Sequence, residues 1–485
     1  MSRRTLFVLA CLALAVVAAG MRFHRLGDWA FTGDELATLD EADRLFQAAD
    51  GPLTSQADRL PRALPVSYSL HSLTYAAFGR DEWGSRVLGA VLATVQVVAV
   101  FVGLVRPLGA APALATALLL LLWPEHLYRS QENRFYMTTA LFASLAMLAG
   151  SQAVARRSMG WTLAACACCF AALLSHTLQA VLFGGLFLAL AAAARAARER
   201  PLARLPLIVI GAGLAAGGFV LVYVVPLLRG WNGDQAWGYG VAHSVMAAVS
   251  QIGWPTALLA GVGAAAVVWQ RDEQGWYWLT WAGVWFAAAL ALPFVVAYHP
   301  GYVFPLSLGV LVLAGRAVAL VYDGLREQRP LAAYAWVGLA CMFNLPGVFS
   351  HYADGNRSDI RTAAQFVSRH VQPGDRVSAF SNRLVQHYAA PGVAPIALSL
   401  ARPLESVQKL SATPERMWIV VASGRAGKPD DLARWLGKHC TLEMQRRPKR
   451  YDYYENVTEV YLYTPGPNFA RVTPESEPAA AAARR

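Results

Sequence analysis

Long apolar runs that are nearly free of charge recur through the first 350 residues of this chain and then stop. A hydrocarbon core about 30 Å thick needs ~20 apolar residues per helix, so about eleven such runs predict a polytopic α-helical membrane protein. The predicted spans are 5–22, 86–105, 109–124, 136–154, 161–174, 177–194, 205–227, 246–269, 276–297, 303–321 and 332–349.

The composition and the placement of charge support this fold class. Hydrophobic residues make up 56% of the 485 residues and charged residues 15%, whereas soluble proteins carry about 25% charged residues. The net charge of +11 does not indicate nucleic-acid binding, because the arginines of the first 350 residues cluster between apolar spans. That placement is a topology signal and predicts membrane lipids as partners. The four lysines all lie in the last quarter of the chain: Lys409, Lys428, Lys438 and Lys449.

The arginines also predict the direction of insertion. The N-terminus reads Met-Ser-Arg3-Arg4 before the first apolar run, which indicates an uncleaved signal anchor with a cytoplasmic N-terminus. Short basic loops stay in the cytoplasm, and an odd number of spans then places the C-terminal domain outside. The arginines of the predicted cytoplasmic loops are Arg3, Arg4, Arg106, Arg156, Arg157, Arg195, Arg198, Arg200, Arg204, Arg271, Arg326 and Arg329.

The segment 161–194 decides this topology. As a single helix it would be too long for the bilayer. Both of its flanks are basic, so both ends are predicted to lie in the cytoplasm. We therefore predict a hairpin of two short spans that turns near Ser175-His176-Thr177. Merging the two spans would reverse the orientation of everything downstream.

Three regions follow from these patterns. Residues 1–350 form the transmembrane domain, with a first outer loop at about 22–85 whose helical patterning suits elements lying along the membrane surface. Residues 351–474 alternate strand and helix patterns and predict a small α/β domain on the outer side. Residues 475–485 are expected to be disordered. The elements predicted for the α/β domain are helices at 360–370 and 430–438 and strands at 376–380, 417–422 and 459–463.

Two adjacent acids, Asp34 and Glu35, are the candidate catalytic residues. They lie about a dozen residues past the first span, where a carboxylate could act as a general base and take the proton of a hydroxyl group. A structural interpretation is also open, because Thr32-x-x-Glu35 fits a capping box and Asp34 would favour the helix dipole. The two interpretations are compatible if Glu35 is the structural member and Asp34 the catalytic one.

A second group of polar residues lies between two apolar spans on the predicted outer side. Its arginines could bind a phosphate. Alternatively, this is an interfacial loop whose arginines reach toward lipid headgroups. The candidate residues of the group are Glu125, His126, Arg129, Glu132, Arg134 and Tyr136.

The remaining candidates are scattered. His299 and Tyr302 belong to an outer turn, and His176 belongs to the turn of the 161–194 hairpin. Aromatic residues at these depths are also ordinary interfacial anchors. Arg86, just before the second span, is a ligand-binding cation or an anchor. The sequence has neither a glycine-rich phosphate loop after a strand nor a His/Cys metal spacing, so we expect neither nucleotide nor metal binding.

Several motifs, in this order along the chain, resemble a known family. They read GRDEWGSRVLGAVLAT, ALLLLLWPEHLYRSQENRFYMTTALFASLAML, LLSHTLQAVL, YHPGYVFPLSLGVLVLAG and DIRTAAQFVSRHVQPGDRV. The chain resembles the bacterial branch of the GT-C glycosyltransferases, the family 39 or protein-mannosyltransferase-like group, which includes the aminoarabinose transferases of lipid A. The likeness covers most of the chain.

The resemblance implies an enzyme of the bacterial inner membrane that works on the periplasmic face. Its donor would be a polyprenyl-phosphate sugar and its acceptor a hydroxyl group on a lipid, glycan or protein. Transfer would invert the anomeric centre and need no metal. The essential aspartate of the family falls on Asp34, with Glu35 beside it. Family arginines fall on Arg86 and Arg134, and a family tyrosine falls on Tyr136.

One position departs from the family pattern. Gly301 stands where related sequences often have an arginine between the His299 and Tyr302 positions. If that arginine holds the donor phosphate in relatives, then Arg134, Arg129 or Arg86 must hold it here, or the donor differs.

Two other functions are compatible with a polytopic chain, namely a transporter or flippase for a lipid-linked glycan and a non-catalytic membrane scaffold. Transporters tend to place ionisable residues near the midplane and to contain internal repeats. The spans here are nearly free of charge and show no repeat. A scaffold would not need acids and arginines on one face, so the sequence favours interfacial chemistry.

Overall fold

The computed structural model forms two compact units. The membrane unit consists of the described residues of Met1–Asp28 and Ala37–Ala353, and the C-terminal unit consists of Trp29–Leu36 and the described residues from Asp354 onward. His299 and the tail 475–485, both named in the sequence analysis, lie outside the described residues. The described residues are 2–47, 64–198, 200–225, 241–294, 300–355, 357–423, 429–446 and 457–465.

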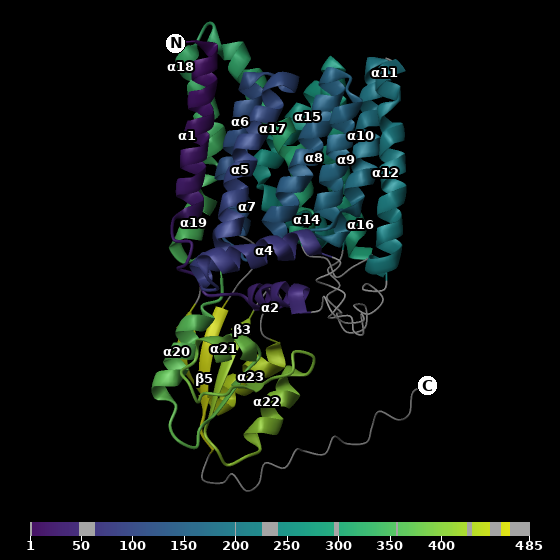
Figure 1. The fold of residues 1–485 in the computed structure, drawn as a ribbon. Coiled ribbons are helices and arrows are strands. Elements are labelled where there is room, and N and C mark those ends of the chain that lie inside the picture. The colour runs from purple at the N-terminus through teal and green to yellow at the C-terminus, as the bar shows by residue number, and fades with distance from the viewer. Residues whose placement is uncertain are drawn as a thin grey trace, which may run out of the picture. The chain divides into compact units, whose positions relative to one another are not determined.

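Apolar helices build the membrane unit (Figure 1). In the described part of the chain, seven helices are long and apolar enough to cross a membrane, three bent helix pairs also qualify, and Met159–Leu173 is a shorter apolar helix. The predicted polytopic helical fold class is therefore confirmed. The helices are α1 (Arg3–Phe23), α2 (Gly33–Gln47), α4 (Pro65–Phe78), α5 (Glu82–Leu108), α6 (Ala110–Leu122), α7 (Pro124–Ser130), α8 (Tyr136–Arg156), α9 (Met159–Leu173), η2 (Thr177–Ala180), α10 (Val181–Ala197), α11 (Arg200–Ala203), α12 (Leu205–Phe219), η3 (Val220–Val224), α14 (Val241–Ile252), α15 (Trp254–Gln270), α16 (Glu273–Ala291), η4 (Leu292–Phe294), η5 (Pro300–Tyr302), η6 (Phe304–Leu306), α17 (Leu308–Arg326), α18 (Pro330–Met342) and α19 (Leu345–Asp354).

The helix break in the 161–194 segment is where the sequence predicts it. Helix α9 ends at Leu173, and η2 begins at Thr177 and leads into α10. The Ser175 hydroxyl donates to Ala171 O at 2.7 Å. The segment is therefore two helices joined by a turn.

Three predicted spans are bent. The span 246–269 turns by 90° between α14 and α15, at Gly253 with φ of 86° and just before Pro255. The span 109–124 corresponds to α6 and ends at a bend of 61° at Pro124, where α7 begins. Proline lacks the backbone N–H that would continue the helix, so the chain changes direction at both places. The bends leave α7 and α14 as short separate helices at the ends of α6 and α15.

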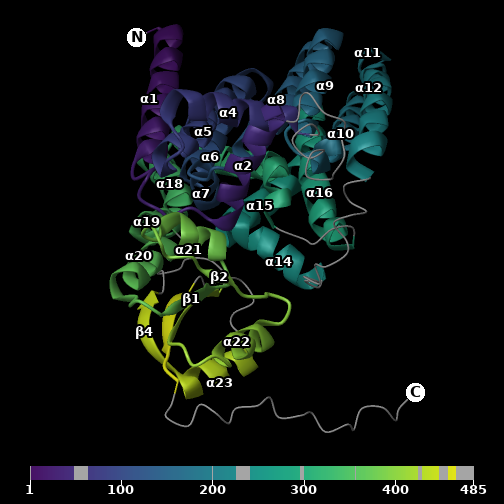
Figure 2. The same cartoon turned by 60° about the horizontal axis from the view of Figure 1, so that its bottom comes forward.

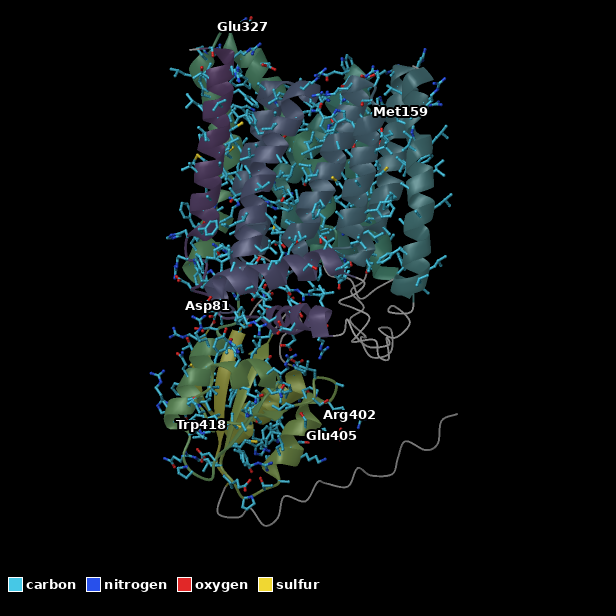
Figure 3. All side chains as sticks on the ribbon, viewed as in Figure 1. Asp81, Met159, Glu327, Arg402, Glu405 and Trp418 are labelled. Atoms are coloured by element: carbon cyan, nitrogen blue, oxygen red, sulfur yellow. The ribbon has the colours of Figure 1, made fainter. Side chains whose placement is uncertain are left out.

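The two ends of the bundle differ. Asp81, which caps α5, lies at one end, whereas Met159 and Glu327 lie at the other (Figure 3). Helix α4 lies crosswise at the Asp81 end (Figure 1), as expected for an element along a membrane surface. The loops that carry the predicted cytoplasmic arginines nearest Met159 and Glu327 therefore share one end of the bundle.

Glycines allow the central helices of the membrane unit to approach closely. A Cβ atom at Gly263 of α15 would lie 2.0 Å from the backbone oxygen of Leu313 in α17. A Cβ atom at Gly315 of α17 would lie 2.2 Å from Oγ1 of Thr116 in α6. Small residues at such contacts are a common device in membrane helix packing. Helix α17 is thus packed tightly between α6 and α15.

We expect Gly263→Ala to destabilise the membrane unit, because the added methyl group must push α15 away from the Leu313 backbone. Overpacking of this kind costs about 1–3 kcal/mol. The matched control is Gly261→Ala on the same helix, where a Cβ atom meets nothing within 4 Å. Thermal unfolding of the two purified variants in one detergent tests this. Equal unfolding temperatures would show that the α15–α17 contact is not tight.

The C-terminal unit is built around a five-stranded sheet of order β2-β1-β3-β5-β4. Strands β2, β1 and β3 are parallel, with Val377 of β1 opposite Trp418 of β3, whereas β5 pairs antiparallel with β3 and β4. The α/β fold predicted for this region is present. Its elements are α20 (Ile360–His370), β1 (Arg376–Ala379), α21 (Asn382–Tyr388), β2 (Ile396–Ala397), α22 (Pro403–Ser411), β3 (Met417–Ser423), α23 (Asp430–His439), β4 (Cys440–Arg446) and β5 (Val457–Tyr463).

Helices cover both faces of this sheet. On one face, Met417, Ile419 and Val421 of β3 pack against buried residues of α22 and α23, which lie side by side in Figure 2. On the other face, Trp418 meets Phe366 of α20, with ring centroids 6.1 Å apart. Alternate residues of β3 therefore point into two layers. Strand β4 was not predicted, because it is an edge strand with mostly polar residues and a bulge.

Candidate functional site

The predicted capping box is present at the start of α2. The Glu35 backbone N–H donates to the Thr32 hydroxyl at 3.3 Å, and Oε2 of Glu35 accepts the Thr32 backbone N–H at 2.8 Å. These reciprocal bonds satisfy backbone donors that a helix start would otherwise leave without partners. Helix α2 therefore begins at a well-defined point.

Glu35 and Asp34 have different environments within the C-terminal unit. The same Oε2 of Glu35 accepts a hydrogen bond of 2.8 Å from Arg357, and this ion pair is buried, with side-chain exposures of 0% and 2%. Asp34, also in the first turn of α2, is exposed. Of the two acids predicted as catalytic, Glu35 thus has the structural environment and Asp34 the accessible one.

In the membrane unit, Arg134 lies among aromatic rings. Its guanidinium carbon is 4.8 Å from the ring centre of Phe135 and 6.0 Å from that of Tyr136. Its Nη1 donates to the hydroxyl of Thr38 in α2 at 3.0 Å. A guanidinium within about 6 Å of an aromatic ring centre is attracted to the ring face.

Two histidines share the surroundings of Arg134. The His176 ring stacks on Phe135 at 4.3 Å and lies 5.6 Å from the ring of Tyr302. Burial, followed by the nearby charge of Arg134, lowers the pKa of His176 to about 3. Burial likewise lowers the pKa of His71 to about 4, with Arg134 again close by. Both imidazoles are therefore neutral at pH 7, and the structure brings together Arg134, His176 and Tyr302.

Arg129 has a different environment, which argues against its predicted role in phosphate binding. Its Nε contacts Glu125 at 2.7 Å and its Nη1 contacts Glu132 at 2.8 Å, and the side chain is 5% exposed. Its guanidinium also lies 4.2 Å from the ring centre of Tyr136 and 5.1 Å from that of Tyr128. Two carboxylates already compensate this one cation, so we assign Arg129, Glu125 and Glu132 to a structural cluster.

His126 belongs to a buried polar network rather than to an open site. Its Nδ1 lies 2.8 Å from Nη2 of Arg22, and its Nε2 lies 3.0 Å from Oε1 of Gln96. Gln96 in turn donates to Ser144 Oγ at 2.7 Å, and Arg22 donates to Leu121 O at 3.2 Å. All these side chains are buried. The network joins α1, α5, α6, α7 and α8, which gives His126 a packing role.

Arg86 is fully buried in the first turns of α5. It donates from Nη1 to the backbone oxygen of Leu26 at 3.2 Å. This bond ties the start of the second span to the end of the first. The surroundings of Arg86 are compatible with both interpretations made from the sequence, anchor and ligand-binding cation.

Sequence reasoning missed several partners. Arg357 stands 322 positions from Glu35, and Arg22 stands 104 positions from His126, so no local spacing could reveal either pair. The Arg129 cluster did have a local signal. Glu125 and Arg129 have the i, i+4 spacing that brings opposite charges together on a helix, and Glu132 follows Arg129 by three residues, just past the end of α7.

Comparison with known proteins finds a family match over part of the chain and a shared fold. Residues 61–229 match the family described as dolichyl-phosphate-mannose-protein mannosyltransferase. The crystal structure of ArnT from Cupriavidus metallidurans in the apo state has a TM-score of 0.58 and 16% identity, covering 95% of this chain and 98% of that one. ArnT bound to undecaprenyl phosphate has a TM-score of 0.52 and 15% identity, covering 94% and 97%.

A second fold relative comes from an archaeon. The apo form of the Archaeoglobus fulgidus oligosaccharyltransferase has a TM-score of 0.57 and 12% identity, covering 87% of this chain and 70% of that one. A comparison with curated proteins gave no significant match. The family match and the shared fold confirm the predicted resemblance to the GT-C superfamily of glycosyltransferases. This chain is a multi-pass membrane protein with the GT-C fold of ArnT.

Proposed function

We propose that this chain is a glycosyltransferase of the bacterial inner membrane. It moves a sugar from a polyprenyl-phosphate donor to a hydroxyl acceptor on the periplasmic face, with inversion and without a metal ion. Its N-terminus lies in the cytoplasm and its C-terminal unit in the periplasm. The family match supports sugar transfer, and the relative solved with undecaprenyl phosphate supports a donor of that chemical class.

The observation that carries the proposal is the placement of an exposed acid on a rigid helix start. Asp34 is exposed, whereas the residues that define its helix start, Thr32 and Glu35, are joined to each other and to Arg357. A general base must be both accessible to the acceptor and held in position. The exposure of Asp34 and its place on this helix start support that role, and the resemblance to the GT-C family implies an essential aspartate at the same position.

In the proposed reaction, the Asp34 carboxylate takes the proton of the acceptor hydroxyl as its oxygen attacks the anomeric carbon. A new C–O bond forms on one face of the sugar. The C–O bond to the phosphate breaks on the other face, and its electron pair leaves with polyprenyl phosphate. Cations must stabilise the charge that develops on the departing phosphate.

We assign that task to Arg134, with Arg86 as the second candidate. Arg134 is oriented by Phe135 and Tyr136 and lies near two neutral histidines. Neutral imidazoles can donate a hydrogen bond to a phosphate oxygen or a sugar hydroxyl without adding charge. Related sequences often have an arginine at the position of Gly301. In this chain, Arg134 would supply the cation instead.

The proposal is tested by supplying the purified full-length protein with labelled synthetic polyprenyl-phosphate hexoses and pentoses and with extracted membrane lipids, glycans and proteins as acceptors. We expect one polyprenyl phosphate released per sugar transferred, and a product of inverted anomeric configuration by NMR. Movement of an intact donor across reconstituted vesicles, with no bond broken in any mixture, would instead establish a transporter.

A further inference from the structure

The acid-bearing segment Trp29–Leu36 is held by residues that lie more than 300 positions later in the chain. Gly355 packs on Trp29 so closely that a Cβ atom there would lie 2.5 Å from the indole ring, and its φ of 70° favours glycine. The ring of Phe31 meets that of His387 with centroids 5.6 Å apart. The segment therefore belongs by its packing to the C-terminal unit.

Hydrogen bonds tie the backbone of the same segment. Arg361 donates to the Trp29 backbone oxygen at 3.2 Å, and the Phe31 backbone N–H donates to the Tyr388 hydroxyl at 2.6 Å. The Arg361 guanidinium also lies 5.4 Å from the ring centre of Tyr388, so the two anchoring side chains orient each other. The backbone entering α2 is thereby fixed at two points, Trp29 and Phe31.

The third anchor is the ion pair of Glu35 and Arg357. One oxygen of Glu35 accepts both the Thr32 backbone N–H and the Arg357 guanidinium, each at 2.8 Å. The cap of α2 and the connection to the C-terminal unit thus depend on the same atom. Because the pair is buried, removing either partner would leave an uncompensated charge in the interior. Asp34 is the residue next to this anchor.

We propose that the C-terminal unit sets the position of the Asp34 carboxylate, with Arg357 and Tyr388 as positioning residues for sugar transfer. This inference rests on the proposed function, in which Asp34 is the general base. Misplacing a reacting group by about 1 Å can cost on the order of 100-fold in rate. The C-terminal unit would then influence the chemical step through the position of Asp34.

The test uses Tyr388→Phe and Arg357→Gln in the full-length protein, with the labelled donor and the acceptor that the wild type turns over. We expect kcat to fall roughly 10-fold for Tyr388→Phe and roughly 100-fold for Arg357→Gln, with KM for the donor unchanged. Arg357→Lys should recover part of the loss, because it restores the charge. Tyr388→Phe removes one hydroxyl group and keeps the ring, so it provides a test if Arg357→Gln does not fold.

The matched control is Arg416→Gln, which breaks the 2.7 Å pair of Arg416 and Asp375 elsewhere in the C-terminal unit. It should leave kcat near the wild-type value, because the pair lies away from the Trp29–Leu36 segment. Equal losses of kcat in Arg416→Gln and Tyr388→Phe would overturn the inference, because general destabilisation would explain both. So would a rise in KM at constant kcat, which would indicate acceptor or donor binding.

The same inference predicts a specific loss of additivity. In an Asp34→Asn background, Tyr388→Phe should cause no further loss of transfer, because the group that it positions is already absent. If Asp34→Asn alone keeps wild-type transfer, the proposed function fails. If Asp34→Asn is inactive while Tyr388→Phe and Arg357→Gln keep wild-type kcat, only the positioning role fails.

Discussion

Asp34→Asn is expected to reduce sugar transfer by a factor of roughly 10²–10⁴, the usual contribution of a general base. Asparagine has nearly the same shape as aspartate but cannot accept the acceptor's proton. The cap of α2 is formed by the reciprocal bonds of Thr32 and Glu35, and Asp34→Asn leaves both of these residues in place. Binding of undecaprenyl phosphate, followed by quenching of tryptophan fluorescence, should therefore stay near the wild-type level while turnover is lost.

Asp40→Asn is the matched control for this experiment. Asp40 is also an exposed acid on α2, and its substitution makes the same chemical change on the same helix. We expect it to retain wild-type turnover. Transfer by Asp34→Asn at the wild-type rate would remove Asp34 from the reaction, and equal losses in both variants would point to the charge of α2 instead.

Arg129→Met is expected to destabilise the protein by about 3–5 kcal/mol, since it leaves the carboxylates of Glu125 and Glu132 without their shared cation in a buried cluster. Methionine keeps much of the length of the arginine stem, so packing changes less than charge. Thermal unfolding in detergent, with the yield of folded protein, measures the effect.

Arg134→Gln is the variant to compare with Arg129→Met, because we assign Arg134 to phosphate binding and Arg129 to structure. It is expected to unfold close to the wild-type temperature and to bind undecaprenyl phosphate roughly 10- to 100-fold more weakly, as for the loss of a hydrogen bond to a charged group. The result that would reverse the two assignments is a stable Arg129→Met variant that no longer binds undecaprenyl phosphate.

Much of the fold follows from patterns within a few residues of each other. The apolar runs, the break near His176 and the helix at 360–370 depend on near neighbours in the chain, and the structure contains all three. The capping box of Thr32 and Glu35 is also a local pattern, because its two residues are three positions apart. The ion pairs of Arg129 could also have been predicted from local spacing, because Glu125 stands four residues before the arginine and Glu132 three residues after it.

The sequence by itself therefore determined the class of protein, the position of its spans and the helix start that carries Asp34. Only the tertiary structure decided which arginines form buried ion pairs and which acids are their partners. Arg129 is compensated by two acids, and Glu35 is paired with Arg357 from the other end of the chain. The reason is physical, since backbone hydrogen bonding and hydrophobic periodicity are local, whereas the partner of a buried charge is set by how distant segments pack. The apolar spans are thus determined locally, and the surroundings of Asp34 are determined by long-range contacts.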